Sequence, residues 1–114
     1  MIQDNLRLVQ RSFPDRNREY VRLLASRLCA TVPRTVVLFA CEESEPTRIF
    51  LACSRDVELN CGEFLRNAFA THGLRGGGSV DLAQGDSPKP ESEKIVAEMA
   101  VTLRSMLARP HVDT

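Results

Sequence analysis

The chain has 114 residues, 43% of them hydrophobic and 26% charged, which fits one globular domain over residues 1–114. Its formal net charge of zero excludes a strong overall field that would attract nucleic acid. No apolar run approaches the roughly 20 residues that cross a bilayer, and the first residues lack signal-peptide character, so we expect a cytoplasmic protein without membrane contact.

The charges are unevenly distributed along the chain. Residues 1–55 carry nine arginines against six acids, whereas residues 56–114 carry six cations against nine acids. Arginine forms bidentate contacts with phosphate, but it is also an ordinary solvated surface residue. The composition is therefore compatible with a nucleic-acid partner and does not require one.

The cysteines and histidines give no sign of a metal site. The four cysteines are spread out without a C-x-x-C pair, so we expect reduced and mostly buried thiols at Cys29, Cys41, Cys53 and Cys61. The two histidines are distant in sequence from any cysteine pair, and both are expected to be solvated, at positions His72 and His111. We expect no metal, no cofactor and no disulfide framework.

The first half of the chain predicts a strand, a helix and two further strands. Residues 5–13 mix apolar and polar side chains, as an edge strand does. Pro14 and Asp15 indicate the start of a helix over 16–31. Its apolar residues recur at helical spacing, and three arginines face outward: Tyr20, Val21, Leu24, Leu28 and Cys29, with Arg18, Arg22 and Arg27.

Two neighbouring apolar segments predict an antiparallel hairpin. Residues 35–41 are almost entirely apolar, which is typical of a buried central strand. Residues 48–54 form a second apolar strand after a short acidic turn. A connection this short favours antiparallel pairing.

The second half predicts a helix, a glycine loop, a strand and a last helix. Residues 62–72 carry apolar side chains at helical intervals, and Gly73 is suited to end the helix. Residues 80–84 read as a short strand, and 85–90 as a polar linker in which two prolines exclude regular structure. The last helix, over 91–108, has an apolar stripe made of Ile95, Val96, Met99, Ala100, Leu103, Met106 and Leu107. The order β-α-β-β-α-β-α predicts an α+β fold with three helices packed on a mixed, mostly antiparallel sheet.

The run Gly73-Leu74-Arg75-Gly76-Gly77-Gly78 is the most unusual feature of the sequence. Consecutive glycines leave the backbone uncovered, so that its N–H groups can face an anion beside the charge of Arg75. The candidate nucleic-acid-binding residues are Arg75, Gly76, Gly77, Gly78, Ser79 and Gln84. A structural explanation stays open, because glycines also form bulges or permit close packing against a helix. Asp81 and Gln84 are also suited to satisfying the loop's own N–H groups.

Three short motifs occur in a fixed order between residues 56 and 85: Glu58-Leu59-Asn60-Cys61-Gly62, Arg75-Gly76-Gly77-Gly78 and Asp81-Leu82-Ala83-Gln84. With this order, the segment resembles the DHH-associated domain found at the C-terminus of alanyl-tRNA synthetase and of DHH-family phosphoesterases. The likeness extends over most of residues 5–108. Departures are Leu74 where a second glycine is common, Ser79 where Arg or His is frequent, and Asp86-Ser87 in place of a further double glycine.

The resemblance implies an accessory domain that binds transfer RNA, with alanine tRNA as the expected RNA. It also implies a parent protein, an alanine–tRNA ligase, whose catalytic and editing domains would be partners. The chain itself is not expected to be an enzyme, because the H-x-x-x-H and C-x-x-x-H ligand pairs, the Asp-His-His motif and a P-loop are all missing from its sequence.

Two alternatives remain from the sequence. The chain could be the nucleotide- or oligonucleotide-binding domain of a DHH-family phosphoesterase. It could also be a self-association module that forms a homodimer through the apolar stripe of its last helix.

Overall fold

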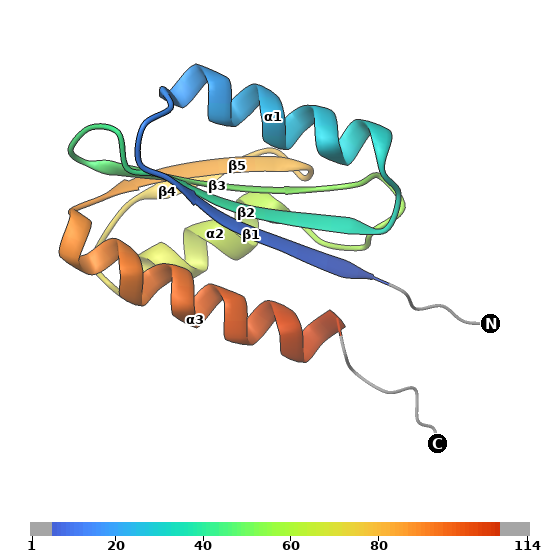
Figure 1. The fold of residues 1–114 in the computed structure, drawn as a ribbon. Coiled ribbons are helices and arrows are strands. Elements are labelled where there is room, and N and C mark those ends of the chain that lie inside the picture. The colour runs from blue at the N-terminus through green and yellow to red at the C-terminus, as the bar shows by residue number, and fades with distance from the viewer. Residues whose placement is uncertain (1–5, 108–114) are drawn as a thin grey trace.

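The computed structural model describes residues 6–107 and shows one five-stranded sheet with three helices (Figure 1). The elements are β1 (Arg7–Phe13), α1 (Arg18–Thr31), β2 (Thr35–Cys41), β3 (Thr47–Cys53), α2 (Cys61–Ala70), β4 (Gly76–Gly78), β5 (Leu82–Ser87) and α3 (Lys89–Leu107). The strand order is β1-β2-β3-β5-β4, with β1 and β2 parallel and the other pairs antiparallel. The predicted α+β fold with a mixed sheet is confirmed.

The two central strands form the core, as predicted. Every residue of β2 is buried, and β2 pairs with β3 in a hairpin whose register sets Phe39 opposite Phe50. Because successive side chains point to opposite faces of a strand, the buried residues divide into two clusters. One cluster lies between the sheet and α1, and the other between the sheet and α2 with α3 (Figure 1).

Strand β1 lies at one edge of the sheet, which confirms the predicted edge strand. A parallel neighbour requires a crossover connection, and α1 supplies it by packing over β2 and β3. The β1–β2 pairing begins with the Arg7 N–H donating to the Arg34 carbonyl at 3.0 Å. It ends with the Glu42 N–H donating to the Phe13 carbonyl at 2.9 Å.

The first helix begins two residues later than the predicted start at residue 16. Helix α1 begins at Arg18, because the Asn17 side chain accepts the Tyr20 N–H at 2.8 Å and so caps the helix. Pro14 and Asp15 lie before this cap. Tyr20 is 43% exposed rather than buried, and the Arg16 guanidinium lies 4.8 Å from the centre of its ring.

The predicted linker over 85–90 is also wrong. Strand β5 runs to Ser87 because Asp86 lies opposite Arg48 and accepts two hydrogen bonds from its guanidinium, at 2.7 and 2.9 Å. This contact lowers the pKa of Asp86. Pro90 occupies the first turn of α3, where a missing N–H removes no helical hydrogen bond.

The apolar stripe of α3 is largely used within the chain. Ile95, Met99, Ala100 and Leu103 are buried against the sheet, whereas Met106 is 40% exposed. The side chain of Leu107 lies outside the described residues. A homodimer would therefore need a surface other than the central part of this stripe.

The thiols are placed as predicted. Cys41, Cys53 and Cys61 are buried, Cys29 is half-buried, and all four are free. Burial raises the pKa of the Cys29 thiol to about 12. A hydrogen bond to Cys53 raises the pKa of Cys61 and lowers that of Cys53.

Within residues 6–107, no helix has the length and apolar character that a bilayer crossing requires. In the same residues, no group of three or more acidic, histidine or cysteine side chains is arranged to hold a metal ion.

Candidate nucleic-acid interface

The glycine run forms a strand rather than the predicted loop. Gly76–Gly78 make up β4, which pairs with β5 through a tight turn at Val80 and Asp81. The Ser79 N–H donates to the Leu82 carbonyl at 2.9 Å. Since hydrogen-bonded pairs alternate in an antiparallel ladder, Gly77 exchanges backbone hydrogen bonds with Gln84. The backbone groups of Gly76 and Gly78 point away from β5.

Packing explains why two residues of β4 are glycines. A Cβ atom on Gly76 would collide with the Leu65 side chain of α2. Gly78 has a φ of 156°, and a Cβ atom there would collide with the Leu82 carbonyl oxygen. The structural explanation of the glycine run therefore holds at both positions.

Gly77 is different. A Cβ atom on this residue would have no atom within 4 Å, and its φ is not in the left-handed region. Paired residues of neighbouring strands face the same side of a sheet, so Gly77 and the half-buried Gln84 share the face opposite α2. Helix α1 packs over β2 and β3 on that face. The backbone of Gly77 is therefore uncovered on this face, next to the side-chain amide of Gln84.

The start of α2 packs directly on the turn of the hairpin. The Cys61 N–H donates to the Val80 carbonyl and the Gly62 N–H to the Ser79 carbonyl, both at 2.8 Å. A Cβ atom on Gly62 would collide with the Gly78 carbonyl oxygen. The N-terminus of a helix attracts anions, but here the first N–H groups of α2 are bonded within the protein.

Ser79 and Asp81 are engaged with the turn. The Ser79 hydroxyl donates to the Asp81 carboxylate at 2.9 Å, and it also lies 3.2 Å from the Leu82 carbonyl oxygen. The Asp81 side chain was expected to satisfy backbone N–H groups, but it instead accepts a hydrogen bond from the Ser79 hydroxyl. These two side chains stabilise the turn and are only partly available to a ligand.

Arg75 lies at the opposite end of β4 from Ser79. It is exposed and follows the end of α2, where Gly73 adopts a φ of 71°. There the Gly73 N–H donates to the Ala70 carbonyl and the Leu74 N–H to the Phe69 carbonyl, which is a Schellman motif. Because four residues of extended chain span about 13 Å, Arg75 and Ser79 are well separated along β4. The predicted site residues therefore form a strip along one hairpin and do not converge on one point.

Sequence reasoning missed Arg55, which the fold brings to the hairpin. A cavity of about 300 Å³ at the turn is lined by Arg55 together with Ser26, Cys29, Ala30, Cys53, Ser79, Asp81 and Leu82. The Cys53 N–H donates to the Asp81 carbonyl at 3.2 Å and so extends the pairing of β3 with β5 to Cys53, two residues before Arg55. No local pattern around Arg55 signals this placement, because the pairing joins segments far apart in the chain.

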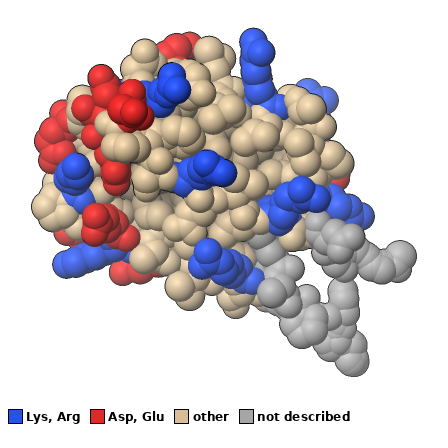
Figure 2. Space-filling model, viewed as in Figure 1, with Lys and Arg blue, Asp and Glu red and all other residues tan. Residues whose placement is uncertain are grey.

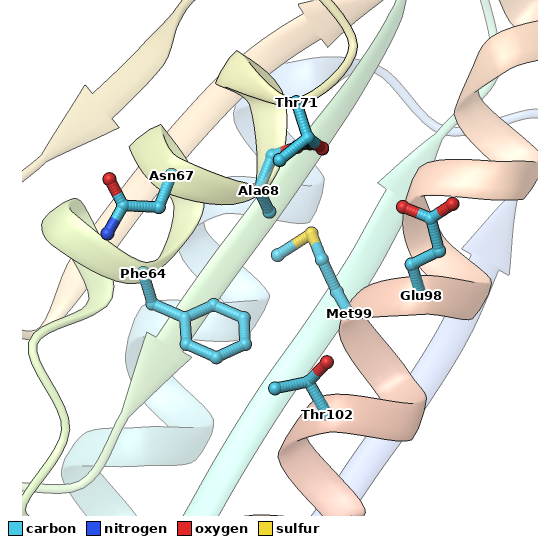
Figure 3. A pocket seen from close by; sticks show the side chains of 7 residues that line it. All are labelled: Phe64, Asn67, Ala68, Thr71, Glu98, Met99 and Thr102. Carbon is cyan, nitrogen blue, oxygen red and sulfur yellow. Dashed lines mark hydrogen bonds between the residues drawn. The ribbon is translucent and has the colours of Figure 1, made fainter.

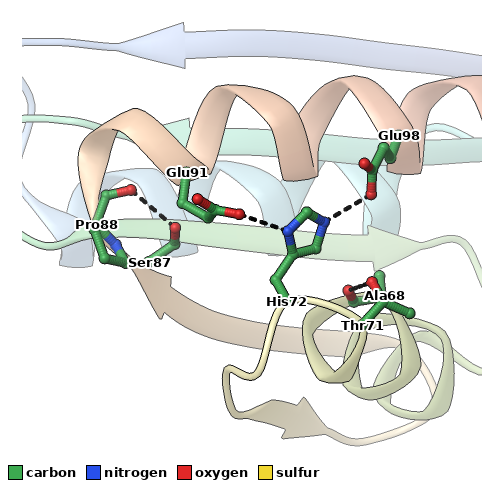
Figure 4. Close-up of polar contacts among 7 residues, drawn as sticks. All are labelled: Ala68, Thr71, His72, Ser87, Pro88, Glu91 and Glu98. Carbon is green, nitrogen blue, oxygen red and sulfur yellow. Dashed lines mark hydrogen bonds and ion pairs between the residues drawn. The ribbon is translucent and has the colours of Figure 1, made fainter.

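His72 is not the solvated side chain that the sequence suggested. Its ring lies between two carboxylates of α3, with Nδ1 at 2.6 Å from Glu91 and Nε2 at 2.7 Å from Glu98 (Figure 4). The hydrogen bonds to Glu98 and Glu91 raise the pKa of His72. The imidazole therefore ties the end of α2 to α3.

A second cavity, of about 380 Å³, lies between α2 and α3 (Figure 3). Phe64, Ala68 and Met99 form its apolar part, and no cation lines it. The carboxylate of Glu98 at its rim is already paired with His72. This cavity lacks the charge that a phosphate contact needs, so the hairpin is the better nucleic-acid candidate.

Comparison with known proteins places the chain in a family. Residues 5–109 match the model of the DHHA1 domain family. An alanine–tRNA ligase of Leptospira biflexa is 30% identical over 100 residues, which are 85% of this chain and 11% of the ligase. An alanine–tRNA ligase of Caldicellulosiruptor saccharolyticus is 28% identical over 88 residues, or 75% of this chain and 10% of the ligase.

A solved structure shares the fold. The C-Ala domain of alanyl-tRNA synthetase from Aquifex aeolicus superposes with a TM-score of 0.74 at 24% identity, over 91% of this chain and 93% of that one. The chain spans about a tenth of the length of the two ligases. The resemblance drawn from the three sequence motifs is confirmed, and the chain belongs to the DHHA1 domain family.

Proposed function

We propose that this chain binds transfer RNA as an accessory domain of an alanine–tRNA ligase or a ligase-like protein. The observation that carries the proposal is Gly77, whose lack of a side chain is not required by its neighbours or its φ. An uncovered strand allows a sugar-phosphate backbone to approach closely. The similarity to two alanine–tRNA ligases supports a parent protein of this kind and makes alanine tRNA the first RNA to test.

One charged and one polar side chain near Gly77 support the same proposal. Arg75 is exposed at the start of β4 and can contact a phosphate, whereas Gln84 offers an amide donor and acceptor next to the bare backbone. The backbone groups of Gly76 point toward the outer edge of the sheet. In this proposal the chain contributes RNA binding, and the remaining domains of the parent ligase carry out aminoacylation and editing.

Binding of an alanine tRNA transcript, measured by fluorescence anisotropy at two salt concentrations, tests the proposal. Gly77→Leu fills open space, so we expect a folded variant that binds roughly tenfold more weakly, a loss of about 1.4 kcal/mol. Arg75→Glu should weaken binding to a similar extent and reduce the salt dependence by about one phosphate contact.

Arg11→Glu is the matched control, because Arg11 is an exposed arginine on β1, at the opposite edge of the sheet from β4. It should leave binding nearly unchanged. If Gly77→Leu and Arg75→Glu bind the transcript as tightly as the unaltered chain, β4 is not the RNA contact. A preference for short oligonucleotides over the transcript would favour the phosphoesterase-type alternative.

A further inference from the structure

The outer edge of β1 carries unpaired backbone groups. In a parallel pair, alternate residues of each strand point their N–H and C=O groups toward the neighbour. Arg7 donates to Arg34 and Phe13 accepts from Glu42, so odd-numbered residues of β1 bond to β2. The N–H and C=O groups of Leu8, Gln10 and Ser12 therefore point outward, away from the sheet.

On the α1 side of this edge, the side chains are basic. Arg7 and Arg11 are exposed and share the face of Val9, which packs with the α1 cluster. Within residues 6–107, neither guanidinium forms an ion pair. Figure 2, in which β1 faces the viewer, shows cations across the middle of the molecule, while the acidic side chains gather toward its left end.

On the α3 side of the edge, the side chains of β1 itself are uncharged. A shallow cavity of about 280 Å³ there is lined by Gln10 and Ser12 of β1 and by Val96 and Ala97 of α3, with Glu42 and Glu93 at its rim. The Gln10 side chain, in the middle of β1, also accepts a hydrogen bond from the Arg104 guanidinium of α3 at 3.0 Å. A small uncharged side chain fits this cavity, and the two glutamates disfavour a further carboxylate.

A second copy of the chain is a poor partner for this edge. Antiparallel pairing of two β1 strands would bring Arg7 of one copy near Arg11 of the other, and like charges across a strand pair are destabilising. Charged residues on an edge strand commonly prevent such self-pairing. The same arginines favour a strand that carries carboxylates.

We propose that β1 binds an extended peptide by adding it to the sheet as a sixth strand. Backbone hydrogen bonds from Leu8, Gln10 and Ser12 hold the peptide, and its alternate side chains face opposite sides. Carboxylates lie on the α1 side against Arg7 and Arg11, and small uncharged side chains lie over the cavity beneath α3. The partner is therefore a protein segment with alternating acidic and small apolar residues.

Two acetylated and amidated pentapeptides test this proposal by ¹⁵N chemical-shift titration of the 114-residue chain. Glu-Val-Glu-Val-Glu should shift the β1 amides and bind at least tenfold more tightly than Lys-Val-Lys-Val-Lys. The double variant Arg7→Glu/Arg11→Glu should reverse this preference. Arg66→Glu, which lies on α2, should leave it unchanged.

A third peptide and a backbone variant separate strand addition from simple charge attraction. The rearranged peptide Glu-Glu-Glu-Val-Val has the same composition, and it should bind at least fivefold more weakly. Gln10→Pro removes an outward N–H that the β1–β2 ladder does not use, so it should abolish binding in a folded chain. If Gln10→Pro fails to fold, the charge-reversal variant still decides the question.

Three results would overturn the proposal. The first is equal affinity for the alternating and the rearranged peptide, and the second is chemical-shift changes confined to residues outside β1. The third is self-association of the chain that Gln10→Pro abolishes, because this would assign the edge to a second copy. Since β1 and β4 are opposite edges of the sheet, the peptide result is independent of the RNA result at β4.

Discussion

A methyl group added to Gly62 would meet the carbonyl oxygen of Gly78, whereas one added to Gly77 would meet nothing within 4 Å. Both residues belong to motifs that the sequence brought forward, and neither motif distinguishes the two roles. A run of glycines has no side-chain pattern, so the sequence cannot tell which glycines are required for packing. That distinction depends on α2 and β5, which approach β4 only in the fold.

Alanine substitutions separate the two roles. Gly62→Ala should lower the free energy of unfolding by about 1–3 kcal/mol, since the backbone of the hairpin must move. Gly77→Ala should change it by less than about 0.5 kcal/mol. Urea unfolding followed by circular dichroism measures both values. A Gly62→Ala variant as stable as the unaltered chain would show that the helix and the hairpin separate easily.

At the scale of elements, the sequence predicted what local side-chain patterns determine. The apolar runs that became β2 and β3 and the periodic segments that became α1, α2 and α3 were all recognised. Strand β4 was missed because three glycines carry no strand signal and their pairing depends on residues 83–85. The end of β5 was misplaced because its last residues are held by Arg48, which lies 38 positions away in the chain.

The contact between α2 and α3 gives a pH-dependent prediction. Glu98 and Glu91 raise the pKa of His72 above its ordinary value near 6.5. The stabilisation that this imidazolium provides is therefore fully present below pH 6.5. It is lost as the pH rises through the raised pKa of the folded state.

His72→Gln should accordingly reduce the free energy of unfolding more at pH 6 than at pH 9. Urea unfolding of both proteins at the two pH values measures the difference, and the comparison cancels every other titrating group. Equal destabilisation at both pH values would mean that His72 contributes packing and not charge.

At the scale of the whole molecule, the sheet separates two cores. Val36 and Leu38 face α2 and α3, and Val37 and Phe39 face α1. The sequence predicted that these residues are buried, but not which helix covers each face, because the direction of the chain after each strand is set by tertiary packing. The same limit applies to Arg55 and His72, whose partners belong to other elements.

The burial of the thiols predicts how they react. Cys29 has a pKa of about 12 and the other three cysteines are buried, so at pH 8 little accessible thiolate is present. We expect a disulfide reagent to modify the folded chain at least a hundredfold more slowly than the chain unfolded in guanidinium, where all four thiols react. Absorbance of the released thiolate follows both reactions. Immediate modification of one thiol in the folded chain, absent from Cys29→Ser, would show that Cys29 is ionised and accessible.

The seating of α2 on the β4–β5 turn has a mechanical consequence. Main chain touches main chain at Gly62 and Gly78, without flexible side chains between them to absorb a displacement. Any molecule that pulls the turn outward must tilt α2 with it, and the imidazole at the far end of that helix passes the tilt to α3. A displacement of β4 is thereby transmitted through α2 to α3.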